Sequence, residues 1–114
     1  MDLDSAVLYS HDINKVIPFY RDILGFKLEY EQPNKFVSFI FPNGGRLGIK
    51  TAVEEREKPG GQTVFIGVDD IEKFYNQFKS ANLDFYEELA DRPWAIQFSI
   101  LDPDKNRVEF MKRK

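Results

Sequence analysis

The chain has 114 residues, of which 42% are hydrophobic and 31% are charged, and its formal net charge is −3. This composition fits one folded domain and excludes an intrinsically disordered chain. The acidic balance argues against nucleic acid as a partner, and the absence of cysteine excludes disulfides and thiol chemistry. No apolar run is long enough to cross a membrane, and the first residues carry no export signal, so we expect a cytoplasmic protein.

The first half of the chain predicts a strand, a helix and three further strands. The helix is expected over Ile13–Leu24, where apolar residues recur at three- and four-residue spacings, with Asp12 as its N-cap and Gly25 just past its end. Pro18 conflicts with this helix because proline lacks a backbone N–H, so we expect either a kink or a later start. The expected strands are Ser5–Ser10, Lys27–Glu31, Lys35–Phe41 and Arg46–Lys50.

A polar stretch, Thr51–Gly61, follows and is expected to be a solvated connector. The second half then repeats the order of the first. Its helix is expected over Ile71–Ala81, with Asp70 as the N-cap. Its strands are expected at Gln62–Val68, Phe85–Leu89, Ala95–Leu101 and Arg107–Met111.

The two halves have the pattern of one module used twice. Displacing the sequence by 58 positions brings Asp12 onto Asp70 and Phe36 onto Trp94; after a three-residue difference in a turn, Gly48 falls on Glu109. The sequence predicts an α+β fold in which two tandem βαβββ modules form curved mixed sheets around a cleft, with the helices outside. We expect one domain over residues 1–114, with module 1 at about 1–52, a linker at about 53–61 and module 2 at about 62–114.

Three segments of the sequence carry a recognisable pattern: AVLYSHDINKVIPFYRDILGFKL, VFIGVDDIEKFYNQFKSANL and RPWAIQFSILDPDKNRVEFMK. The first combines a strand with Asp-hydrophobic, Phe-Tyr and Leu-Gly-Phe, and the last has an Asp-Pro-Asp turn followed by an acidic residue. This pattern resembles the vicinal oxygen chelate superfamily of glyoxalases, bleomycin-resistance proteins and extradiol dioxygenases. The resemblance implies the fold over nearly the whole chain, but no single activity, because this fold hosts many chemistries.

The resemblance also implies four metal-ligand positions, on the first and last strands of each half, in the metal-dependent members. Those positions here match Ser5, Gly48, Thr63 and Glu109, of which only Glu109 is a strong ligand. A divalent transition metal needs about three or four protein ligands, so we expect no metal and no cofactor. Glu109 is equally well interpreted as a structural carboxylate paired with Arg46 or Arg107. The sole histidine, His11, is interpreted as a partly exposed loop residue rather than a general base.

Alternation along the strands divides the side chains between two faces of each sheet. Leu8 and Ile66 are expected to face the helices, while the other face is expected to line a largely apolar and aromatic ligand site. The expected ligand-binding residues are Ser5, Tyr9, Phe39, Thr63, Phe65, Trp94, Gln97 and Glu109. Trp94 is also open to interpretation as a core residue, and no catalytic residue is assigned.

The predicted function is therefore a metal-free protein, resembling the bleomycin-resistance branch, that sequesters a mostly apolar or aromatic small molecule such as an antibiotic. The alternative is a metal-dependent glyoxalase- or dioxygenase-type enzyme acting on a substrate with vicinal oxygens. A third hypothesis is a regulatory or interaction module that uses the fold as a scaffold. We also expect a symmetric homodimer, because exposed strand edges invite pairing and the resemblance points the same way.

Overall fold

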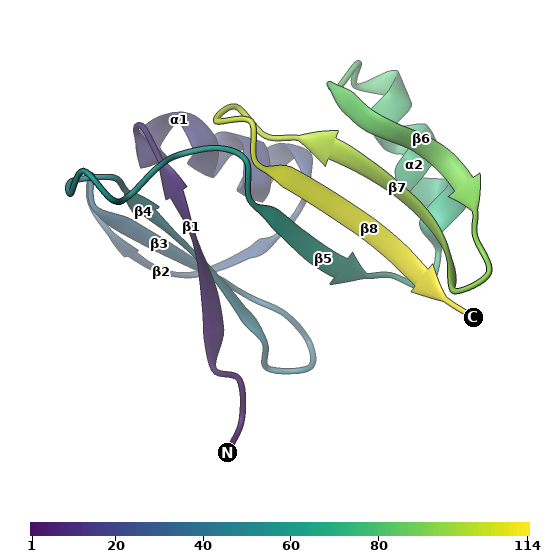
Figure 1. Ribbon diagram of the computed structural model, residues 1–114, viewed down its shortest axis with the longest axis horizontal. Helices are drawn as coiled ribbons and strands as arrows, with labels where there is room; N and C mark the ends of the chain where they lie inside the picture. The colour runs from purple at the N-terminus through teal and green to yellow at the C-terminus, as the bar shows by residue number, and fades with distance from the viewer. The chain divides into compact units, whose positions relative to one another are not determined.

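Two four-stranded sheets, each packed against one helix, make up the computed structural model, which describes residues 1–114 (Figure 1). Contacts divide the chain into two units, Met1–Gly60 and Gly61–Lys114. Each unit has the order strand, helix, strand, strand, strand. The predicted α+β fold with two repeated βαβββ modules is thereby confirmed.

In the first module the strand order is β1-β4-β3-β2, with β1 parallel to β4 and the other pairs antiparallel. The helical segment has two parts, α1 (Ile13–Pro18) and the π-helix η1 (Phe19–Ile23). The strands are β1 (Ser5–Ser10), β2 (Lys27–Gln32), β3 (Phe36–Ile40) and β4 (Arg46–Thr51).

The second module repeats this arrangement with the order β5-β8-β7-β6, in which β5 and β8 are the parallel pair. Its helix is α2 (Ile71–Ser80), and its strands are β5 (Thr63–Gly67), β6 (Phe85–Asp91), β7 (Ala95–Leu101) and β8 (Arg107–Arg113). The expected boundaries lie within two residues of the observed ones in both modules. Neither helix has the length and apolar character that crossing a membrane would require.

Pro18 is accommodated by a change of helix type rather than by a later start. The helix begins at Ile13, and beyond Pro18 it continues as the π-helix, in which the Leu24 N–H donates to the Phe19 carbonyl at 2.9 Å. Proline supplies no N–H to the preceding turn, and a wider turn re-forms hydrogen bonds after it. The expected later start is therefore wrong. Pro18 instead marks the residue after which the helix changes from α to π.

The two aspartates at the helix starts behave differently. The Asp12 carboxylate accepts a hydrogen bond from the Asn14 N–H at 3.0 Å, so the predicted N-cap is confirmed. Asp70 occupies the N-cap position of α2, but its side chain accepts no hydrogen bond there. The prediction is right for the position of Asp70 and wrong for its side-chain contact.

Aromatic rings fill the space between each helix and its sheet. In the first module the Tyr20 ring lies 5.8 Å from Phe39, between ring centroids. In the second module the Phe78 ring lies 6.0 Å from Phe98 and 5.3 Å from Phe110. All five side chains are almost completely buried. Burial of such large rings is a major stabilising contribution, and it commits one face of each sheet to the helix.

Strand pairing corrects the expected alignment of the two modules. Gly48 pairs with Val7 and Ser38, and Glu109 pairs with Phe65 and Ser99, so Gly48 and Glu109 are equivalent as expected. It follows that Ser38 corresponds to Ser99. The extra residues of the second module therefore precede β7 instead of lying in the turn after it.

The extra residues lie at the hairpin between β6 and β7, where six residues separate the paired Ala90 and Gln97 and only three separate Gln32 and Phe36. Strand β6 is also irregular. Its register with β7 shifts between Phe85 and Glu87 and again between Glu87 and Ala90. Such bulges place additional residues in one strand without breaking the sheet. The expected equivalence of Phe36 with Trp94 is consequently wrong, because pairing makes Phe36 the counterpart of Gln97.

The connector between the modules is not simply solvated, because Glu57 is only 7% exposed. Its Oε1 accepts hydrogen bonds from the backbone N–H groups of Val53 and Glu54, at 2.8 and 3.1 Å, and its Oε2 pairs with Lys50 Nζ on β4. The Lys50 hydrogen bond, followed by the two backbone hydrogen bonds, lowers the pKa of Glu57 to about 2. Glu57 thus ties this part of the connector to the first sheet.

The different contacts of the two N-cap aspartates predict different effects of the same substitution. Asp12→Ala should lower the free energy of unfolding by about 1 kcal/mol, because the Asn14 N–H loses its acceptor. Asp70→Ala is the matched control and should cost less than about 0.5 kcal/mol. Urea unfolding monitored by circular dichroism measures both; equal losses in the two variants would contradict the assignment of the Asp12 cap.

Candidate ligand-binding site

Each sheet has a face without its own helix, which we call the open face. On β1, Leu8 is 4% exposed and Val7 is 41% exposed; on β5, Ile66 is 9% exposed and Phe65 is 58% exposed. The buried members of these pairs lie on the helix side, and the exposed members lie on the open face. This alternation follows from the two-residue period of an extended strand.

The predicted site residues do not all lie on an open face. Ser5, Tyr9, Thr63 and Phe65 belong to the open-face sets of the two edge strands, and Gln97 and Glu109 belong to the open face of the second sheet. Phe39 is the exception: it is fully buried, with its ring beside Tyr20 and Phe26 on the helix side. Its expected placement with Gln97 is corrected, because the two strands do not align in the assumed register.

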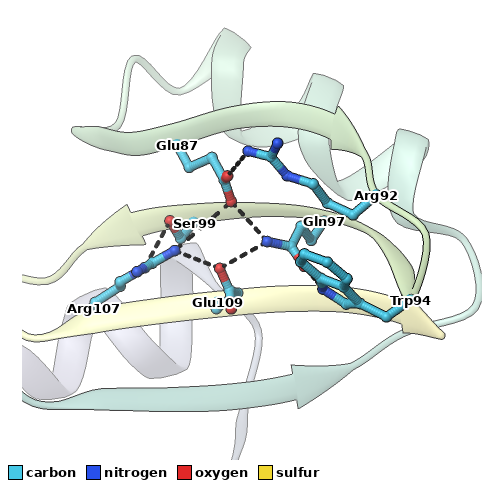
Figure 2. Close-up of polar contacts among 7 residues, drawn as sticks. All are labelled: Glu87, Arg92, Trp94, Gln97, Ser99, Arg107 and Glu109. Carbon is cyan, nitrogen blue, oxygen red and sulfur yellow. Dashed lines mark hydrogen bonds and ion pairs between the residues drawn. The ribbon is translucent and has the colours of Figure 1, made fainter.

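Gln97 connects residues from three parts of the second module (Figure 2). Its Oε1 accepts a hydrogen bond from Trp94 Nε1 at 2.9 Å. Its Nε2 donates to Glu87 Oε1 at 3.0 Å and to Glu109 Oε1 at 3.4 Å. Three of the predicted site residues, Trp94, Gln97 and Glu109, are thus held together by hydrogen bonds on one sheet.

Arg107 closes the other end of this network (Figure 2). Its Nη2 donates to Glu109 Oε1 at 2.5 Å, and its Nε donates to Ser99 Oγ at 3.1 Å. The guanidinium carbon lies 4.4 Å from the centre of the Tyr86 ring, within cation–π range. Of the two arginines that we considered as partners of Glu109, the structure therefore selects Arg107.

The second carboxylate of the network, Glu87, is paired in the same way. Arg92 Nη2 donates to Glu87 Oε2 at 2.7 Å, and Arg107 Nη2 lies 3.7 Å from Glu87 Oε1. Burial alone raises the pKa of Glu87, but the hydrogen bonds from Arg92 and Gln97 outweigh it, so the pKa lies below its ordinary value. Two carboxylates and two guanidiniums leave the network with balanced charge.

Sequence reasoning missed the contribution of β6 to the site. Glu87, Arg92 and Tyr86 all belong to β6 or to the turn after it, and none was expected there. The register shifts in β6 break the simple alternation that identifies an open-face residue elsewhere. The available signal is the pair of acidic residues, Glu87 and Glu88, within this strand.

The first module carries a simpler version of the same arrangement. Arg46, the counterpart of Arg107, donates to both carboxylate oxygens of Glu29 at 2.8 and 3.1 Å. The position equivalent to Glu109 is Gly48, and a Cβ placed there would lie 2.8 Å from Cζ of Phe36. The Phe36 ring therefore occupies the space where the second module has a carboxylate.

The residues at the four implied metal-ligand positions do not fit a transition metal. Ser5 and Thr63 supply only weakly coordinating hydroxyls, Gly48 supplies no side chain, and Glu109 is already paired with Arg107. No group of three or more His, Cys, Asp or Glu side chains is arranged to hold a metal ion. His11 is exposed in the turn before α1.

The paired modules with open sheet faces define a fold class shared by binding proteins and enzymes. The chain belongs to the glyoxalase/bleomycin resistance protein/dioxygenase superfamily, whose family model matches residues 2–110. No curated protein matches the sequence at a significant level.

Solved structures agree with this assignment at the level of the fold. TnmS3, an antibiotic binding protein from Streptomyces sp. CB03234, has a TM-score of 0.85 and 18% identity over 100% of this chain and 97% of its own. TioX from Micromonospora sp. ML1 has a TM-score of 0.82 and 20% identity over 100% of both chains. A lactoylglutathione lyase from Agrobacterium tumefaciens has a TM-score of 0.81 and 20% identity over 97% and 92%. Identities this low establish a shared fold alone.

The packing of Phe36 over Gly48 predicts opposite effects for two glycine-to-alanine substitutions. Gly48→Ala should lower the free energy of unfolding by about 1 kcal/mol, because the new methyl group must displace the Phe36 ring. Gly67→Ala, in the edge strand β5, meets no atom within 4 Å and should raise the stability by about 0.5 kcal/mol by restricting the unfolded chain. Urea unfolding compares the two; a loss at Gly67 equal to that at Gly48 would contradict the close contact.

Proposed function

We propose that the protein is a metal-free small-molecule binding protein that sequesters a mostly apolar or aromatic ligand on its open sheet faces. The observation that carries this proposal is the replacement of a chelating side chain at Gly48 by the packed Phe36 ring. Glu109, the one strong ligand among the implied positions, is engaged by Arg107 and Gln97. These residues can bind a small molecule through van der Waals contacts and hydrogen bonds, without a metal ion.

Two large aromatic side chains support an apolar or aromatic ligand. Phe65 is 58% exposed and Trp94 is 56% exposed, although rings of this size are usually well buried. Both belong to the second module, beside the polar network of Gln97 and Glu109. An apolar surface with a few placed polar groups is the usual composition of a small-molecule site. Ser5, Tyr9 and Thr63 are proposed as additional contacts.

The known relatives in fold are compatible with both binding and catalysis. TnmS3 is described as an antibiotic binding protein, which supports antibiotic sequestration as one form of the proposed function. The lactoylglutathione lyase represents the enzymatic alternative. We favour binding for this chain, since only one of its four implied ligand positions has a side chain suited to a catalytic metal.

We also propose that the protein forms a symmetric homodimer. Strands β1, β2, β5 and β6 are edge strands of their sheets, and edge strands favour association. Twofold dimers are the commonest way of burying such surfaces. Sedimentation equilibrium at micromolar concentration should give twice the chain mass of 13.4 kDa. A mass of one chain throughout that range would refute the dimer.

Ligand binding is tested with a thermal-shift screen of aromatic antibiotics and metabolites against protein whose metal content has been measured. A ligand at 100 times its Kd should stabilise the fold by about 2.7 kcal/mol. Phe65→Ala should weaken the binding of a hit at least tenfold, whereas Val53→Ala, which shortens an 81% exposed side chain of the connector, should not. Unchanged affinity in Phe65→Ala would place the site elsewhere, and one tightly bound transition metal per chain would favour the enzyme.

A further inference from the structure

An exposed ring with a fixed orientation is the first element of a more specific site. Trp94 is 56% exposed, yet its indole N–H is bound to Gln97 Oε1 at 2.9 Å. This hydrogen bond orients the ring before any ligand arrives. A ring that is already oriented loses little conformational entropy on stacking, so Trp94 is prepared to bind a flat molecule.

Gln97 is held in one orientation by its neighbours. The residue is 6% exposed, and its amide lies between the Trp94 indole, which only donates, and the carboxylates of Glu87 and Glu109, which accept. Rotation of the amide by half a turn would place its NH2 group against the Trp94 N–H and its oxygen against the two carboxylates. Gln97 therefore fixes the Trp94 ring and the Glu109 carboxylate relative to each other.

Glu109 retains an unused acceptor. The residue is 4% exposed, and its Oε1 receives the hydrogen bonds from both Arg107 and Gln97. Its Oε2 receives no hydrogen bond from any residue. This oxygen is not among the fully buried side-chain atoms that lack a partner, so a donor from a ligand can reach it, and an ionised carboxylate accepts only.

The charges around Glu109 indicate what kind of donor suits it. Arg107 pairs with Glu109 and Arg92 pairs with Glu87, so the network is neutral without a ligand. A neutral N–H or O–H group satisfies Oε2 without disturbing this balance, whereas an anion would face a buried carboxylate. Phe65, the cross-strand neighbour of Glu109, adds a second exposed ring beside the acceptor.

We infer that the open face of the second module recognises a planar ring bearing a neutral hydrogen-bond donor. Trp94 stacks on the ring and Glu109 Oε2 accepts from the donor. Gln97, which is bonded to both residues in Figure 2, is the positioning residue for both. This inference rests on the proposed binding function and names its ligand class.

Two probes that differ in a single donor test the inference. Indole carries a ring N–H, and 1-methylindole has the same flat ring with that donor blocked. Trp94 is the sole tryptophan, so the ¹⁵N-labelled protein has one indole N–H signal, and its shift reports binding at this site. Indole should bind about tenfold more tightly than 1-methylindole, as expected for one hydrogen bond to a charged acceptor.

Variants assign this preference to the named atoms. Glu109→Gln should reduce the preference for indole to less than threefold. Arg107 and Gln97 donate to the Oε1 position and hold the amide oxygen there, so an amide N–H, which only donates, replaces the free acceptor. Gln97→Met should alter the position and width of the Trp94 indole signal and weaken both probes. Gln77→Met, on the exposed side of α2, is the matched control and should leave both affinities unchanged.

Three outcomes would overturn the inference. They are equal affinity of the two probes for the unmodified protein, a tenfold preference that persists in Glu109→Gln, and a Trp94 signal that neither probe shifts. In each case the proposed function survives if the thermal-shift screen yields a ligand whose affinity depends on Phe65. If no ligand is found by either method, the proposed function fails as well.

Discussion

The two-residue period of the strands is the constraint on which the rest of this structure depends. One helix per module requires one apolar sheet face, and buried residues such as Phe39 and Phe98 supply it. Their strand neighbours Ser38 and Gln97 are thereby directed to the opposite face. A slip of one residue would exchange the two sets, so the packing that stabilises each module also determines which side chains are available for recognition.

The elements could be predicted because their signals are local. Apolar spacing and turn residues identified the strands, and the helix start at Asp12 needed only its own sequence. The site was harder to predict because it depends on register: the choice of Arg107 over Arg46 for Glu109, and the burial of Phe39, follow from pairing across strands. The bulges of β6 concealed Glu87 for the same reason.

The two modules differ at a position where a metal-binding protein would need similar side chains, since Gly48 in one is equivalent to Glu109 in the other. The resemblance implies metal-ligand positions on both halves, but one half has Gly48 beneath Phe36, and the other has Glu109 within a network of hydrogen bonds. Each module keeps an arginine–glutamate pair in which the arginines, Arg46 and Arg107, are at matching positions and the glutamates, Glu29 and Glu109, are not. The two modules thus share their strands and these arginines, but they do not share side chains that could bind a metal.

The anchoring of Glu57 has a consequence for behaviour in acid. Its pKa in the folded chain is about 2, below the ordinary value of 4.5, so the unfolded chain binds the proton first as the pH falls. The stabilisation is therefore present above about pH 4.5 and is lost progressively as the pH falls from there to about 2. Cells and acidic organelles alike leave this carboxylate ionised. The ionised Glu57 carboxylate holds the connector against the first sheet, and physiological acidification does not neutralise it. The connector is therefore not a pH sensor.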